Sequence, residues 1–179
     1  MASRSFLAMG ISMLTRLDAH DRALFARYAV GPSRRRAARW GWTLVTHLGG
    51  ATGSIAAATI PIIAGGSSRE IGIHALVALV ASHLVVQAIK RTVGRPRPSR
   101  HGGRSWMDEP DRFSFPSGHS AAAMSVAAVF ALAWPALAPL LLPIAVVVGF
   151  SRVRLGVHYP GDVLAGQVIA IVTALIVVA

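Results

Sequence analysis

Five long apolar runs, separated by short polar clusters, dominate the pattern of this chain. A helix needs roughly 20 apolar residues to cross the ~30 Å hydrocarbon core of a membrane, and the runs come near or beyond that length. They extend over Trp40 to Gly65, Ile71 to Ile89, Ser120 to Trp134, Pro135 to Phe150 and Val163 to Ala179. The pattern predicts an all-α fold, an integral membrane bundle of about five transmembrane helices.

The stretch from Leu14 to Tyr28 has a different pattern. Apolar residues recur there at roughly helical spacing, with Arg and Asp residues between them. This periodicity predicts an amphipathic helix lying on the membrane surface, with a soluble cap as the alternative. We therefore divide the chain into an N-terminal interfacial segment, residues 1–39, and a transmembrane domain, residues 40–179.

Composition agrees with a membrane protein. The 179 residues are 54% hydrophobic and only 14% charged, with a mean hydropathy of +0.56. Basic loops beside a bilayer explain the net charge of +11, and no nucleic-acid partner is expected, because basic nucleic-acid binders are normally soluble and polar. Cysteine is absent, which excludes disulfides and thiolate chemistry.

Three polar clusters lie at the ends of the apolar runs. Lys90 follows the second run, His119 precedes the third, Arg152 follows the fourth and His158 precedes the fifth. In an antiparallel bundle these ends face the same side of the membrane. A basic loop at the interface is an adequate explanation for any one cluster, but the convergence of three favours a single site.

These clusters contain the groups that bind a phosphate ester. Lys90, Arg97 and Arg152 supply three fixed cations, which neutralise the phosphate and stabilise its charge in the transition state. Ser117 and Gly118 lie where a helix is expected to begin. Free backbone N–H groups at a helix N-terminus add donors for the same anion.

Two histidines and a carboxylate complete the set. His158 is the candidate nucleophile, and Asp162, four residues later, can hydrogen-bond its other ring nitrogen. Pro160 marks the expected start of a helix, which leaves His158 in the preceding loop. His119 is the candidate general acid for the departing alkoxide, and then the base that activates water.

The three clusters resemble, in residue type, spacing and order, the signature of the type 2 phosphatidic acid phosphatase (PAP2) family of membrane lipid phosphatases, which vanadium haloperoxidases share. The matching segments are Lys90-x6-Arg97-Pro98, Pro116-Ser117-Gly118-His119 and Ser151-Arg152-x5-His158-x3-Asp162. Larger members of the family resemble a bundle of six spans. This chain has five apolar runs, with the surface helix in place of the first span.

The resemblance implies a metal-independent phosphatase, without a cofactor, that forms a phosphohistidine at His158 with help from Asp162 and with His119 as acid and base. Its phosphate would be bound by Lys90, Arg97, Ser117, Gly118 and Arg152. The expected partners are membrane lipids and a lipid phosphate substrate: a polyprenyl diphosphate, phosphatidylglycerol phosphate, phosphatidic acid or a prenyl-linked sugar phosphate. The oligomeric state is open.

Other charged residues near the clusters have simpler interpretations. Arg95 also precedes a proline, but its spacing from Lys90 differs from that of the motif. We expect Arg95 to contact the site from behind or to bind a lipid headgroup. Asp108, Glu109 and Asp111 resemble a metal cluster, but an acidic loop that balances nearby arginines is the favoured interpretation.

The distribution of charge bears on orientation. Of the 18 Lys and Arg residues, 17 fall on the side of the expected site and only Arg69 on the other. The positive-inside rule then favours a cytoplasmic site in a bacterial inner membrane. Several of these cations are needed for the chemistry, and many bacterial members of the family act at the periplasmic face, so the side stays open.

Three functional hypotheses follow. The first is a lipid phosphate phosphatase, the second is a lipid phosphotransferase that uses the same intermediate, and the third is a non-catalytic membrane protein that binds or transports anions. Vanadate-dependent oxidation fits so apolar a chain less well. Release of inorganic phosphate from lipids that is lost in His158→Ala and His119→Ala but retained in EDTA supports the first, whereas a transporter would move anions without hydrolysis.

Overall fold

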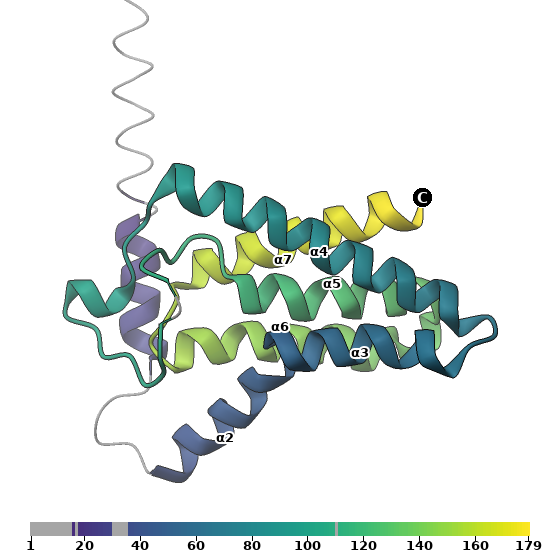
Figure 1. Ribbon diagram of the computed structural model, residues 1–179. Helices are drawn as coiled ribbons and strands as arrows, with labels where there is room; N and C mark the ends of the chain where they lie inside the picture. Colours follow the sequence, from purple (N-terminus) through teal and green to yellow (C-terminus); the bar gives the residue numbers. More distant parts are fainter. Residues whose placement is uncertain (1–15, 17, 30–35, 110) are drawn as a thin grey trace, which may run out of the picture.

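The regular structure of the chain is helical (Figure 1). A computed structural model describes residues 16, 18–29, 36–109 and 111–179. Its named helices are α2 (Arg36–Leu48), α3 (Ala51–Ala64), α4 (Ser68–Val93), α5 (Gly118–Ala133), α6 (Ala138–Arg154) and α7 (Pro160–Val178), with short 3-10 helices η1 (Pro98–His101) and η2 (Pro135–Leu137). Residues 18–28 are also helical. The prediction of an all-α fold is confirmed.

Each predicted transmembrane run forms a helix, but the first run is broken. Its two parts, α2 and α3, meet at Gly49 and Gly50 with a bend of 43°. A Cβ at Gly49 would overlap the side chain of Val148 and lie 2.9 Å from the carbonyl oxygen of His119. The bend therefore brings the chain close to α5 and α6 at a position that requires glycine.

The helices differ in how well they match the thickness of a membrane. By length and composition, α4, α7 and the Pro135–Arg154 segment can each cross a bilayer, and the bent pair α2–α3 passes the same test only when its two helices are taken together as one span. Helix α5 is apolar but has only 16 residues. It lies at the centre of the bundle, where it contacts α4, α6 and α7.

Small residues form most of the core. The buried alanines are Ala58, Ala75, Ala78, Ala121, Ala127, Ala128, Ala145, Ala170 and Ala174. Such side chains let transmembrane helices pack closely, which is how the alanine-rich runs of the sequence are used. Ser82 of α4 and Ser125 of α5 share a hydrogen bond of 2.8 Å, so both hydroxyls are satisfied inside the apolar interior.

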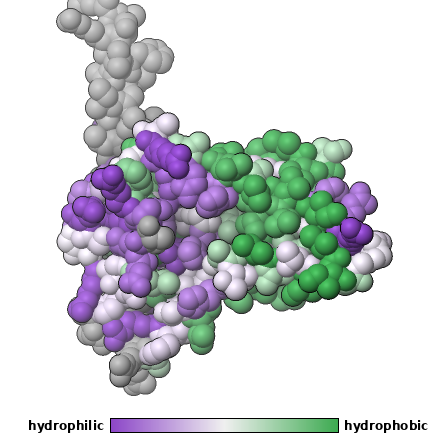
Figure 2. Space-filling model, viewed as in Figure 1, coloured by the Kyte–Doolittle hydropathy of each residue, from purple (hydrophilic) through white to green (hydrophobic). Residues whose placement is uncertain are grey.

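The surface of the bundle is apolar over most of its length. In Figure 2 this apolar surface lies between a large polar end and a smaller polar patch at the opposite tip. Ile63, Leu84 and Ile176 are 84%, 63% and 72% exposed. Large apolar side chains exposed in such numbers would be unfavourable in water, and they are the natural surface of a protein surrounded by lipid. The protein is therefore an integral membrane protein.

The N-terminal helix, residues 18–28, lies across the polar end of the bundle (Figure 1). The ring of Phe25 packs edge-on against Tyr159, with centroids 5.4 Å apart. Leu14 and Leu17, part of the predicted amphipathic pattern, lie outside the described residues. Asp18 and Asp21 of this helix pair with Arg95 of the loop after α4, a contact that the hydrophobic pattern alone did not predict.

Candidate active site

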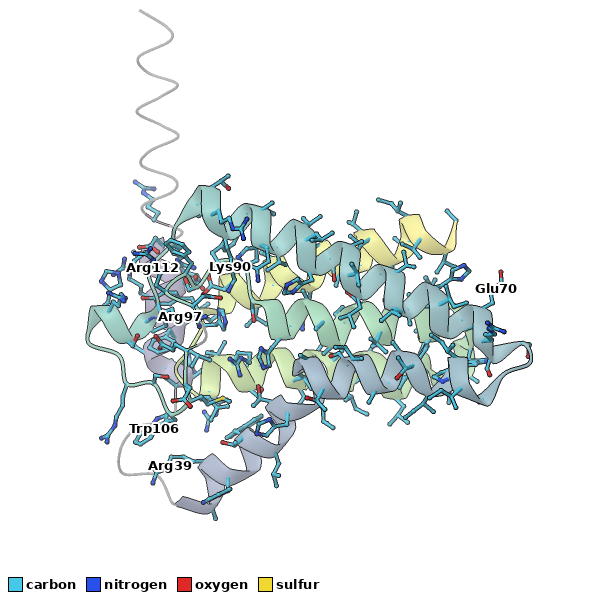
Figure 3. The ribbon with its side chains drawn as sticks, in the orientation of Figure 1. Arg39, Glu70, Lys90, Arg97, Trp106 and Arg112 are labelled. Carbon is cyan, nitrogen blue, oxygen red and sulfur yellow. The ribbon has the colours of Figure 1, made fainter. Side chains whose placement is uncertain are left out.

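The three polar clusters meet at the polar end of the bundle. Helices α4 and α6 end there, while α5 and α7 begin there, and this antiparallel order brings together Lys90, His119, Arg152 and Asp162. Figure 3 shows Lys90 and Arg97 at this end, with Glu70 at the opposite tip. The loops between the helices carry Arg97, Ser117 and His158.

Arg97 and Lys90 form one cationic side of the site, and both are buried, at 1% and 4% exposure. Nη1 of Arg97 donates to the carbonyl oxygen of Val157 at 2.9 Å and lies 3.4 Å from Nε2 of His158. Arg97 therefore fixes the loop before α7 and places positive charge beside the ring of His158.

Asp111 offsets part of the charge of this side. Its carboxylate oxygens lie 2.7 Å from Nζ of Lys90 and 2.9 Å from Nη2 of Arg97. Burial acts to raise the pKa of Asp111, but the hydrogen bonds from these two cations hold that pKa below its usual range. The acidic loop thus balances basic residues as interpreted from the sequence. Because Asp111 is an anion between two cations, an incoming phosphate must displace it or share them.

Arg152 forms a second cationic side and has different partners. Its Nη1 donates to the hydroxyl of Thr46 at 2.8 Å and lies 3.2 Å from Sδ of Met107. Its side chain is buried, and Nε has no hydrogen-bond partner among the described residues. Thr46 and Met107 had no recognisable signal in the sequence, because both lie outside the motifs.

His158 lies in the loop before α7, as the proline at position 160 predicted. Its Nδ1 is 3.5 Å from Oδ2 of Asp162, the distance of an electrostatic contact and slightly longer than a good hydrogen bond. Burial lowers the pKa of His158 to about 4, against the opposing effect of the Asp162 charge. The imidazole is therefore neutral at pH 7, the form in which a ring nitrogen is nucleophilic.

Ser117 and Gly118 stand at the N-terminus of α5. The N–H of Ser117 donates to the carbonyl oxygen of Asp162 at 2.9 Å, which ties the start of α5 to the start of α7. The Ser117 hydroxyl is buried without a hydrogen-bond partner in the described structure. A Cβ on Gly118 would meet no atom within 4 Å, so space adjoins this helix N-terminus.

His119 follows directly and points toward the bend between α2 and α3. Its Nε2 would lie 3.7 Å from a Cβ placed on Gly50. The break between α2 and α3 thus lies beside the ring of His119.

The unsatisfied polar atoms of the site share one chemical tendency. Ser117 Oγ and Arg152 Nε are buried without hydrogen-bond partners among the described residues. Buried donors left unpaired are costly, and an anion in the site would satisfy donors of this kind. Together with the cations and the helix N-terminus, they make the site suitable for a phosphate group.

Arg95 contacts the site from behind, one of the two roles expected from the sequence. Its Nη1 donates to Oδ1 of Asp162 at 2.7 Å. The same guanidinium pairs with Asp18 and Asp21 of the N-terminal helix. In the sequence, Asp18 and Asp21 are three residues apart, which places both on one face of a helix. This spacing is the signal that could have identified them as a pair.

The fold and site define a helical membrane protein with a buried, cationic site for an anion, next to a histidine and a carboxylate. The chain belongs to the PAP2 superfamily, whose family model matches residues 71–179. This confirms the resemblance noted in the sequence motifs.

Similar proteins include several bacterial lipid phosphatases. The lipid A 1-phosphatase of Rhizobium etli is 36% identical over 102 residues, which cover 54% of this chain and 44% of that protein. The decaprenylphosphoryl-5-phosphoribose phosphatase of Mycolicibacterium smegmatis is 40% identical over 87 residues, covering 48% and 46%. The matching segment is thus less than half the length of each of these relatives.

Solved structures show the same fold over most of the chain. The PAP2 type phosphatidylglycerolphosphate phosphatase of Bacillus subtilis aligns with a TM-score of 0.72 and 25% identity, covering 90% of this chain and 84% of that one. Aquifex aeolicus LpxE aligns with a TM-score of 0.75 and 24% identity, covering 87% and 93%. At this identity, the second likeness concerns the fold alone.

Proposed function

We propose that this protein is a membrane lipid phosphate phosphatase. The observation that carries the proposal is the setting of His158: a buried, neutral imidazole between the carboxylate of Asp162 and the guanidinium of Arg97. A histidine nucleophile needs a ring nitrogen free of a proton, a cation to bind the phosphate, and an anion to stabilise the imidazolium product. This arrangement supplies all three.

The reaction would proceed in two displacements. Nε2 of His158 attacks phosphorus, the bond between phosphorus and the lipid oxygen breaks, and His119 gives its proton to that oxygen. Water, deprotonated by His119, then attacks the phosphohistidine, the bond between nitrogen and phosphorus breaks, and phosphate leaves. Throughout, the phosphoryl oxygens would be bound by Lys90, Arg97, Ser117, Gly118 and Arg152. No step requires a metal ion or a cofactor.

The substrate would be a phosphomonoester or diphosphate of a lipid. The four candidates are a polyprenyl diphosphate, phosphatidylglycerol phosphate, phosphatidic acid and a prenyl-linked sugar phosphate. The apolar surface beside the site supports a substrate that stays in the membrane, and the names of the bacterial relatives support the same class. Residues 40–179 would form the catalytic domain, residues 1–39 an interfacial segment, and a bacterial inner membrane the location.

The test is release of inorganic phosphate from these lipids by the purified protein in detergent micelles. We expect His158→Ala and His119→Ala to abolish release, and activity to persist in EDTA. His101→Ala is a matched control, because His101 is exposed on η1. Undiminished release by His158→Ala would refute the mechanism. Movement of phosphate across vesicle membranes without hydrolysis would indicate a transporter instead.

A further inference from the structure

Arg95 lies between three carboxylates that come from opposite ends of the chain. Its Nη1 is 2.7 Å from Oδ1 of Asp162 and 2.8 Å from Oδ2 of Asp21, and its Nη2 is 2.7 Å from Oδ1 of Asp18. Burial alone would lower the pKa of Arg95, but the carboxylates raise it above its usual range. The guanidinium is thus permanently charged, and the three carboxylates hold it in place.

Asp162 depends on Arg95 for its orientation. The side chain of Asp162 is fully buried, and each oxygen has a separate task. Oδ1 accepts from Arg95, while Oδ2 accepts from the N–H of Tyr159 at 2.8 Å and lies 3.5 Å from Nδ1 of His158. Without the guanidinium, Oδ1 would be a buried charge without a partner, and the carboxylate could turn away from His158.

The N-terminal helix holds Arg95 in place. Asp18 and Asp21 take its outer N–H groups, and the ring of Tyr159 lies 4.1 Å from its guanidinium carbon. Asp21 also accepts from the N–H of Gly161 at 2.7 Å, so this helix is attached to the first turn of α7. Three bonded partners and a stacked ring leave Arg95 little freedom to rotate.

We propose that Arg95, held by Asp18 and Asp21 of the N-terminal helix, is a positioning residue that orients Asp162 toward His158. The proposal rests on the proposed function and deepens it, because it makes the N-terminal helix part of the catalytic apparatus. Arg95 does not touch the reacting phosphate; it acts through Asp162.

The first experiment measures kcat and KM for lipid phosphate hydrolysis by variants of Arg95. We expect Arg95→Met to lower kcat roughly 10- to 100-fold with little change in KM, because a misplaced catalytic group affects the chemical step more than binding. Arg95→Lys, which keeps the charge but loses the planar fork, should recover part of the loss. Arg100→Met is the matched control, since Arg100 is an exposed arginine of the same loop.

The second experiment asks whether the effect passes through Asp162. In an Asp162→Asn background, Arg95→Met should cause little further loss, because residues that act as a unit are not additive. A full additional loss would overturn the proposal. The double substitution Asp18→Asn with Asp21→Asn should lower kcat by a smaller factor and leave KM unchanged. This double variant tests the proposal if Arg95→Met does not fold.

The outcomes separate this proposal from the proposed function. If His158→Ala keeps full activity, the phosphohistidine mechanism fails whatever the Arg95 variants do. If His158→Ala is inactive while Arg95→Met and the double aspartate variant keep the kcat of the wild type, only the positioning role is refuted. A change in KM alone would also refute it, because that result would place Arg95 in substrate binding.

Discussion

The two cationic sides of the site balance their charge differently. On the side of Lys90 and Arg97, the carboxylate of Asp111 bridges both cations at 2.7 and 2.9 Å. On the other side, Arg152 is equally buried but has only a hydroxyl and a thioether as side-chain partners, and none of the ion pairs of the described residues includes it. One side keeps one of its two positive charges after pairing with Asp111, and on the other side the full charge of Arg152 is left for an external anion.

This difference distinguishes the cations that stabilise the fold from the cation that mainly binds the ligand. A buried cation that pairs with a carboxylate contributes to the fold, whereas an unpaired buried cation is costly and is retained where it serves a ligand. We therefore expect Arg152 to contribute mainly to phosphate binding and turnover. Arg97 and Lys90 should contribute to both, and Asp111 should compete with the phosphate.

The largest expected effect is that of Arg152→Met. Removing a cation aimed at the developing charge of the transition state should lower kcat/KM for phosphate release by roughly 100- to 1000-fold. The thermal midpoint in detergent should stay the same or rise, because an unpaired buried charge is lost. Phosphate release and a melting curve on the same sample measure both. A large fall in the melting temperature would show that Arg152 is structural.

A smaller effect is expected for Asp111→Asn. The amide keeps the shape of the side chain but removes the anion that competes for Lys90 and Arg97, so inorganic phosphate should inhibit the variant at roughly five- to tenfold lower concentration, about 1–1.4 kcal/mol of binding. Competitive inhibition of lipid hydrolysis measures this constant. Glu109→Gln is the control, because Glu109 lies in the same acidic loop and bonds to Ser99 instead. Weaker inhibition by phosphate would contradict the role assigned to Asp111.

The smallest expected effect concerns pH. The active form of His158 is neutral and its pKa is about 4, so the acidic limb of the kcat/KM profile, which protonation of His158 sets, should lie near pH 4. Three charged groups face His158: Asp162, which raises the pKa of His158, and Arg152 and Arg97, which lower it. Arg152→Met should therefore move this acidic limb to higher pH. A pH–rate profile of the residual activity gives the shift, and a limb that moves to lower pH would contradict the arrangement.

The sequence predicted the fold and the gathering of the polar residues at one end of the bundle, but not the contacts between them. Apolar runs of membrane length and the polar residues at their ends determine a bundle and one functional face, because lipid leaves a chain few alternatives to helices. The break at Gly49 and Gly50 was missed, since those glycines lie within an unbroken apolar run.

Partners that lie far apart in the sequence were also beyond prediction. The pairing of Arg95 with Asp18 is an example, because nothing local says which distant carboxylate a guanidinium will meet once the chain is folded. Asp111 was recognised as part of an acidic loop, but its bridge between Lys90 and Arg97 depends on the path of that loop. Motif spacing predicts which residues gather, and packing decides which of them touch.

The shortness of α5 has a consequence for the surrounding bilayer. Its 16 residues span about 24 Å, some 6 Å less than a typical hydrocarbon core, and the site lies at its N-terminus. Because α4, α6 and α7 surround α5, the longer helices meet the lipid, and the site would lie below the headgroup level of the leaflet around the protein. The phosphate of a lipid would then reach His119 and Ser117 by moving below its own leaflet, and turnover in vesicles should depend on the acyl-chain length of the host lipid.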